Sequence, residues 1–185
     1  MVLKISPHSA DAERGIHEAR TDSEEQEAFQ ELEQLIPREP KNADLHTTYA
    51  EELLERNRND EAKDQATYSL KLDKQQWHAY GVLGQVAMST GDSKTARANL
   101  EMAIRHDPTD DDSLVALADI EIHEKNLTAA VKLLRQLVKV APEESMGHTK
   151  LADALDLSGN ADEAKRERAT AAAIESSTKS KAGAQ

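Results

Sequence analysis

Apolar residues return at the spacing of an α-helix along most of this chain, and polar segments separate the helical stretches. The stretch that ends at Ile36 shows the pattern, because Phe29, Leu32 and Leu35 fall at helical spacing while its outer face is rich in glutamate. Further along, eight helical stretches form four pairs. The predicted first helices span 43–57, 75–90, 111–125 and 145–158, and their partners span 59–73, 92–106, 127–141 and 161–175.

Small residues recur at a fixed interval of 34 residues, which predicts one helical unit repeated several times. One column holds alanine in every unit, and a second holds a small residue that follows a large apolar one. A single alanine column would be weak evidence, because alanine is the best helix former. Two columns with one period predict hairpins that stack cooperatively through close contacts. The columns are Ala28, Ala62, Ala96, Ala130 and Ala164, and then Ala50, Gly84, Ala118 and Ala152.

These columns resemble the tetratricopeptide repeat, a helical hairpin of 34 residues. The resemblance implies an all-α fold, a right-handed helical-repeat solenoid of helix-turn-helix hairpins. The second full unit carries the family pattern at Tyr80, Leu83, Gly84, Ala96, Leu100, Ala103 and Pro108. The third carries it at Leu114, Leu117, Ala118, Ala130, Leu134, Leu137 and Pro142.

The repeat phase divides the chain into one continuous array with atypical ends. Its predicted parts are an irregular N-terminus (1–8), a degenerate repeat or capping helices (9–42), four repeats (43–76, 77–110, 111–144 and 145–175) and a disordered tail (176–185).

The resemblance also implies a function, because the family typically binds peptides or partner proteins in a concave groove lined by its first helices. We therefore expect a non-catalytic protein-binding module, such as an adaptor, an assembly scaffold or a chaperone-like protein. The positions carried over from the family are called the predicted groove. They are Thr48, Glu51, His78, Val82, Gln85, Met88, Val115, Asp119, Ile122, His123, Met146, Lys150 and Asp153.

The predicted groove is apolar at its centre and acidic at its rim, so an apolar or basic-apolar peptide segment is the expected ligand. Many co-chaperones of the family hold a C-terminal carboxylate with a clamp of Lys, Arg and Asn. Thr48, Val82 and Ala116 stand at equivalent positions here, and Lys150 is the lone cation. The clamp is absent, which argues against an acidic chaperone tail as the ligand.

The charge balance narrows the range of partners. There are 23 basic and 35 acidic residues, a net charge of −12. Nucleic-acid binding needs a basic stripe, and anionic membrane surfaces also attract basic segments, so neither partner is expected. No run approaches the roughly 20 apolar residues of a membrane span, so no membrane insertion is expected. The absence of cysteine fits the cytoplasm and the periplasm equally. Because residues 1–7 lack the apolar stretch of a secretory signal, the expected location is the cytoplasm, or the periplasm if a signal or anchor has been removed.

No enzyme activity, cofactor or metal is predicted. Asp119 and His123 share a helix face, but the spacing places no third ligand beside them. The run 110–112 lacks the glycine and glutamate of a calcium loop and is better explained by helix capping. His78 and His123 would make binding in the groove sensitive to pH.

Glu121 departs from the repeat pattern, because a large packing residue is usual at its position. A carboxylate between helices is unfavourable unless solvated or paired, so we expect Glu121 at the rim and Ile122 in the packing.

Two alternative functions follow from the ends of the array. One is a self-assembling structural protein, a homo-oligomer formed through exposed terminal repeats. The other is a regulatory repeat domain of a larger protein.

Overall fold

The structure, a computed structural model, describes residues 22–182 of the chain. Within that range the chain is helical and contains no strand, which confirms the predicted all-α class. The predictions for residues 1–21 and 183–185 lie outside the described residues. The helices are α2 (Asp22–Leu35), α3 (Ala43–Glu55), α4 (Asn59–Leu72), α5 (Trp77–Ser89), α6 (Ser93–His106), α7 (Asp111–His123), α8 (Leu127–Val140), α9 (Ser145–Leu157) and α10 (Ala161–Ala182).

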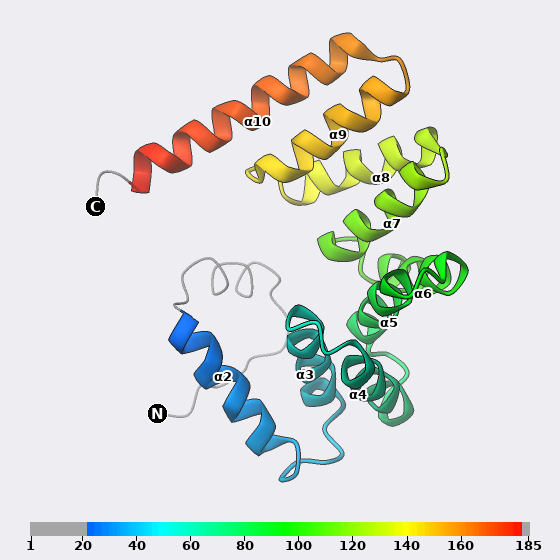
Figure 1. Cartoon of the computed structure of the whole chain (residues 1–185), viewed down its shortest axis with the longest axis vertical. Coiled ribbons are helices and arrows are strands. Elements are labelled where there is room, and N and C mark those ends of the chain that lie inside the picture. Colours follow the sequence, from blue (N-terminus) through cyan, green and yellow to red (C-terminus); the bar gives the residue numbers. More distant parts are fainter. Residues whose placement is uncertain (1–21, 183–185) are drawn as a thin grey trace.

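Four helical hairpins, α3–α4, α5–α6, α7–α8 and α9–α10, follow one another along a curved path (Figure 1). Each helix contacts its hairpin partner or a helix of an adjacent unit, as a solenoid requires. In Figure 1, α3 and α5 lie nearer the opening of the curve than α4 and α6, and α2 and α10 lie at its two ends. α3 and α5 therefore lie on the inner side of the curve, and the surface formed by the first helices is called the inner face.

The last helix is longer than predicted, because α10 continues to Ala182. The prediction of a tail is therefore wrong for residues 176–182. That segment lacks an apolar face, which was the reason to exclude it from the helix. It also contains no glycine or proline before Gly183, and its alanine and lysine residues are good helix formers.

The turns inside the hairpins share one backbone conformation at 34-residue intervals. Asn57, Gly91, Lys125 and Gly159 all have positive φ, between 57° and 83°. Asparagine and glycine adopt this left-handed conformation readily at the end of a helix, whereas lysine does so at some energetic cost. The hairpin geometry therefore imposes the turn even where Lys125 occupies it.

The alanine column lies between the two helices of each hairpin. Ala62, Ala96, Ala130 and Ala164 have no exposed surface. The second small column also lies against the partner helix, because a Cβ added to Gly84 on α5 would lie 2.6 Å from Leu100 Cγ on α6. Within the four hairpins both columns thus act as predicted, by allowing the helices to approach, whereas Ala28 on α2 is only half-buried.

Two histidines at the same repeat position, three units apart, have matching contacts. The Nδ1 atoms of His46 and His148 lie 2.6 Å from Gln65 Oε1 and Glu167 Oε2, respectively. Their Nε2 atoms each lie 3.2 Å from a proline carbonyl oxygen six residues earlier. Both imidazoles are buried and join their hairpin to the preceding connection.

Glu121 is buried, with 5% of its surface exposed, so the predicted rim position is wrong. The Arg97 guanidinium from α6 pairs with the Glu121 carboxylate and also donates to Glu124 Oε2 at 2.7 Å. Ile120 supplies the buried apolar side chain, and Ile122 is only half-buried. A cation from the neighbouring hairpin makes the buried carboxylate tolerable.

Replacing Leu100 with alanine should lower the free energy of unfolding by about 2–5 kcal/mol, because this side chain is fully buried against the small columns. The same substitution at Leu157, which is 62% exposed, should change it by less than about 0.5 kcal/mol. Urea unfolding followed by circular dichroism measures both. Equal losses at the two positions would contradict the assigned packing.

Arg97→Ala should destabilise the chain by about 3–5 kcal/mol, because it leaves the buried Glu121 carboxylate without its cation. Arg135→Ala breaks a solvent-exposed pair with Glu163 and should cost less than about 1 kcal/mol. Adding Glu121→Leu should restore much of the stability lost in Arg97→Ala. The same unfolding assay tests the set, and failure of that rescue would count against the buried pair.

Candidate functional site on the first helices

All residues of the predicted groove lie on the first helices of the hairpins. The structure brings them together as neighbouring rows along the array, rather than around one enclosed pocket. Thr48 and Glu51 are on α3; His78, Val82, Gln85 and Met88 on α5; Val115, Asp119, Ile122 and His123 on α7; and Met146, Lys150 and Asp153 on α9.

Their exposure differs, and one residue is not available at the surface. Val82 is 3% exposed and belongs to the same core cluster as Tyr49 and Leu53. Its placement on the groove surface is therefore wrong, because the junction of α3 and α5 encloses it. Met88 remains half-buried, and Met146 is 49% exposed.

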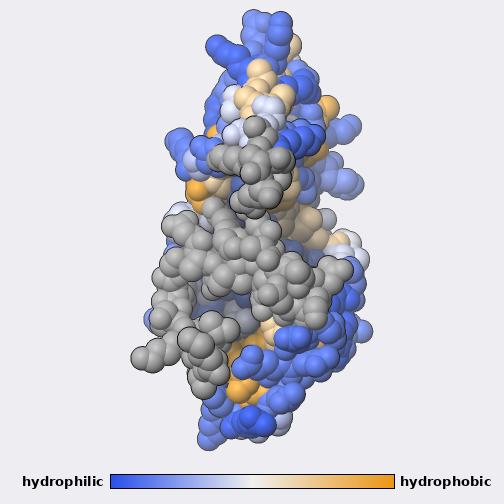
Figure 2. Space-filling model, turned by 90° about the vertical axis from the view of Figure 1, so that its left-hand side faces the viewer, coloured by the Kyte–Doolittle hydropathy of each residue, from blue (hydrophilic) through white to orange (hydrophobic). Residues whose placement is uncertain are grey.

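On the side of the molecule that Figure 2 shows, the described surface is mostly hydrophilic, with small apolar areas between hydrophilic residues. Three apolar residues of the predicted groove, Met88, Val115 and Ile122, pack partly against the cores of their hairpins. Each of these residues therefore exposes only part of its side chain, and together they do not form a continuous apolar strip.

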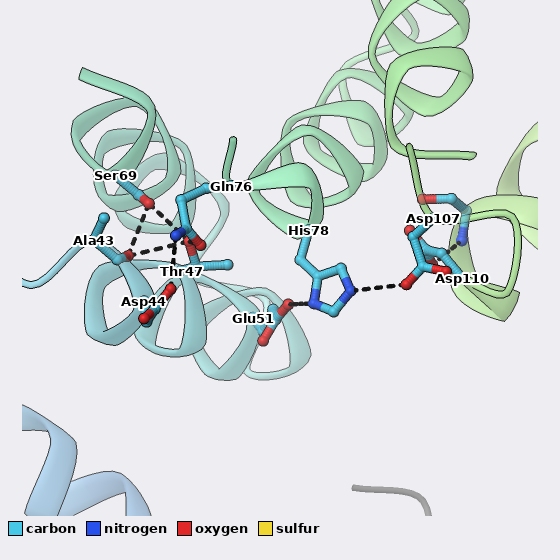
Figure 3. Close-up of polar contacts among 10 residues, drawn as sticks. Ala43, Asp44, Thr47, Glu51, Ser69, Gln76, His78, Asp107 and Asp110 are labelled. Carbon is cyan, nitrogen blue, oxygen red and sulfur yellow. Dashed lines mark hydrogen bonds and ion pairs between the residues drawn. The ribbon is translucent and has the colours of Figure 1, made fainter. Parts of the chain in front are cut away.

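His78 links neighbouring units at the inner face, where Figure 3 shows it between two carboxylates. Its Nδ1 lies 3.6 Å from Glu51 Oε1 on α3, and its Nε2 lies 3.3 Å from Asp107 Oδ2 in the connection before α7. Burial lowers the pKa of His78, but the charge of Glu51, the bond to Asp107 and the charge of Asp110 outweigh it. The net pKa is above the ordinary value.

Asp107 is held as a carboxylate by the same cluster. Burial raises its pKa, but hydrogen bonds from Thr109 and the contact with His78 lower it below the usual value. The Thr109 amide and hydroxyl donate to Asp107 Oδ1 at 2.9 and 2.6 Å. Asp107 was not among the predicted groove residues, because its connection folds back beside α5, which a repeat pattern does not indicate.

Gln76, also absent from the predicted groove, connects α3 to the segment before α5 (Figure 3). Its Nε2 donates to Asp44 Oδ1 at 2.6 Å, and its Oε1 accepts from Thr47 Oγ1 at 3.2 Å. Ser69 on α4 donates to the Ala43 carbonyl at 2.8 Å, which closes the network. Gln76 is the last residue of a four-residue polar connection, and an amide at such a place gives no sequence signal for this role.

The acidic residues of the rim are paired within the chain. Lys150 Nζ on α9 donates to both carboxylate oxygens of Asp119 on α7, at 2.7 and 3.0 Å. Arg168 from α10 donates to Asp153 at 2.8 Å and to Asp156 at 2.6 Å. Lys150 is therefore not the only cation at this face, and part of the expected negative charge is compensated.

Comparison with protein families is consistent with this arrangement of hairpins. Two family models, both described as the tetratricopeptide repeat, match residues 47–111 and 87–152. Together they cover 47–152, more than half of the chain. The chain is a tetratricopeptide repeat protein. No curated protein matches its sequence.

Several proteins with solved structures have a fold similar to that of this tetratricopeptide repeat protein. A crystal structure of MamA matches with a TM-score of 0.69 at 16% identity, covering 88% of this chain and 95% of that one. MamA from Desulfovibrio magneticus RS-1 gives 0.66 at 18% identity, covering 90% and 92%. YrrB gives 0.60 at 16%, covering 82% and 78%, and is described as having an unusual peptide-binding site. These likenesses concern the fold alone.

Among residues 22–182, no group of three or more histidine, aspartate or glutamate side chains is placed to hold a metal ion. Within the same range, none of the helices combines the length and apolar character that crossing a bilayer requires. Asp119, which shares a helix face with His123, is bound to Lys150 instead.

The position of His78 predicts a stability that depends on pH. A raised pKa in the folded state means that its contact with Glu51 and Asp107 stabilises below the unfolded pKa of about 6.5, and that this contribution is lost as pH rises through the folded pKa. His78→Gln should therefore lose more unfolding free energy relative to wild type at pH about 5.5 than at pH about 8.5.

Urea unfolding of wild type, His78→Gln, Glu51→Gln and the double variant gives the coupling between the two residues at each pH. The coupling should shrink on going to the higher pH. A coupling that does not change with pH would exclude the charged contact.

Proposed function

We propose that this tetratricopeptide repeat protein is a non-catalytic interaction module whose first helices bind an apolar or basic-apolar peptide segment. The observation that supports it most is the side-chain set on the inner face. Partly exposed Met88, Val115 and Ile122, with exposed Met146, lie on adjacent first helices beside carboxylates. Methionine adapts to varied apolar ligands, which suits a peptide-binding surface.

Charge at this face favours a ligand with a basic residue. His78 is shared by two carboxylates, and Arg168 is likewise shared by Asp153 and Asp156. Each cluster therefore keeps an excess of negative charge after its internal pairing. A lysine or arginine in the ligand would complement that excess and orient the segment.

The same arrangement argues against an acidic C-terminal tail as the ligand. Lys150, the one cation among the predicted groove residues, is engaged by Asp119. Releasing it to hold a carboxylate would leave Asp119 without its partner. YrrB, a neighbour in fold, is described as having an unusual peptide-binding site, which supports peptide binding by a related array without fixing the ligand.

Met88→Asp combined with Met146→Asp should weaken binding of the native partner by about tenfold or more, because the substitutions remove apolar contacts and place charge in the interface. Met146 is exposed, whereas Met88 is half-buried against the core, so the variant should keep its helical signal but unfold at a somewhat lower midpoint than wild type. The partner would be captured from the native host, and its affinity measured with the purified components.

Ala98→Asp with Ala172→Asp is the matched control, since both alanines are exposed on second helices and the added charge is the same. The control should bind as the wild type does. Unchanged binding by the folded methionine variant would exclude the inner face as the binding site.

Self-assembly is the second candidate function, and exposed apolar side chains on α9 favour it. Leu157 is 62% exposed and Met146 is 49% exposed on that helix. Light scattering over a range of concentrations separates the candidates. A particle mass that rises with concentration supports assembly, and a constant monomer mass excludes it.

A further inference from the structure

Charge is distributed unevenly between the first helices α3 and α7 and the second helices α6 and α8. The first helices α3 and α7 each contain four acidic residues and no lysine or arginine. The second helix α8 contains three basic residues and no acid, and α6 contains three basic residues and one acid. A chain with a net charge of −12 therefore presents a basic outer helix.

A surface cavity of about 650 Å³ lies along α8. Its lining comes from α8 and from the connection between α9 and α10, and none of the predicted groove residues takes part. Leu127, Thr128, Val131, Lys132, Arg135, Gln136, Lys139, Ser158 and Asn160 line it. We call this surface the α8 cavity.

Two of the three cations that line the α8 cavity are available to a ligand. Lys132 and Lys139 are exposed, and neither forms an ion pair with a residue of the described range. Arg135 is held by Glu163 of α10, with Nη2 at 2.8 and 2.9 Å from the two carboxylate oxygens. Lys132, Arg135 and Lys139 recur at helical spacing, so they follow one side of α8.

Apolar side chains accompany these cations. Leu127 is half-buried in the cavity, and Val131 lies at its base with 8% of its surface exposed. A polyphosphate backbone would make no apolar contacts with Leu127 and Val131. A peptide that carries both carboxylates and leucine-like side chains fits both features.

We propose that the α8 cavity is a second docking surface, which binds an acidic amphipathic segment of a partner protein. Its carboxylates would pair with Lys132 and Lys139, and its apolar side chains would cover Leu127 and Val131. This surface is separate from the inner face, so one molecule can hold two different segments at once. The repeat protein would then connect two partners rather than capture one.

Fluorescence anisotropy with a labelled helical peptide of about 15 residues, built of leucine and glutamate at amphipathic spacing, tests the proposal. Lys132→Glu with Lys139→Glu should weaken its binding by about tenfold or more. Lys63→Glu with Lys71→Glu makes the same change in net charge at exposed lysines of another second helix, α4, and should leave binding within about twofold of wild type.

Further probes separate the chemistry of the ligand. A peptide with serine in place of leucine and an oligothymidylate of similar charge should both bind about tenfold more weakly than the amphipathic peptide. Equal binding of the oligothymidylate would overturn the proposal in favour of a general polyanion surface. Equal loss in the α4 control would show non-specific attraction and overturn it as well.

Two more results bear on the same surface. The Met88→Asp, Met146→Asp variant should bind the acidic peptide normally, which keeps this test independent of the inner face. Sedimentation of the chain alone should show no association that depends on Lys132 and Lys139. An association lost in that lysine variant would instead identify the α8 cavity as a contact between copies.

Discussion

The close approach of two helices through small side chains is the interaction on which the whole array depends. Ala62, Ala96, Ala130 and Ala164 are completely enclosed, and Gly84 leaves no room for a Cβ beside Leu100. Because each hairpin is this thin, its apolar residues reach across to the next hairpin, and stacking buries them. The inner rows, the outer helix α8 and the ion pairs between units all take their positions from that spacing.

The sequence alone is sufficient to predict the structural features that repeat. A 34-residue period locates small columns and hairpins, because packing between identical units requires the same residue sizes at the same positions. It does not reveal features that occur once. Val82 shares a column with exposed Thr48, yet it is enclosed at the joint of α3 and α5. Glu121 breaks the pattern, and only the structure shows that Arg97 reaches it from the neighbouring hairpin.

Charged groups were the least predictable part of the candidate site. Their identities indicated an acidic rim, but pairing depends on side-chain reach between units. Lys150 spans to Asp119, His78 contacts Glu51, and Arg168 turns back to Asp153. The repeat phase gives the direction of a side chain and not the rotamer that brings two charges together. For α8, the sequence shows the basic composition but not the cavity that lies along the helix.

The contacts between adjacent units of residues 22–182 also allow the array to bend elastically. Because the helices of residues 22–182 make their main contacts within a hairpin or with an adjacent unit, a small rotation at each joint adds to the next and changes the curvature of the array. Drawing neighbouring first helices together tightens the curve and spreads the second helices apart, and the reverse motion closes them. A load on either side of the solenoid is therefore transmitted as bending to the other side.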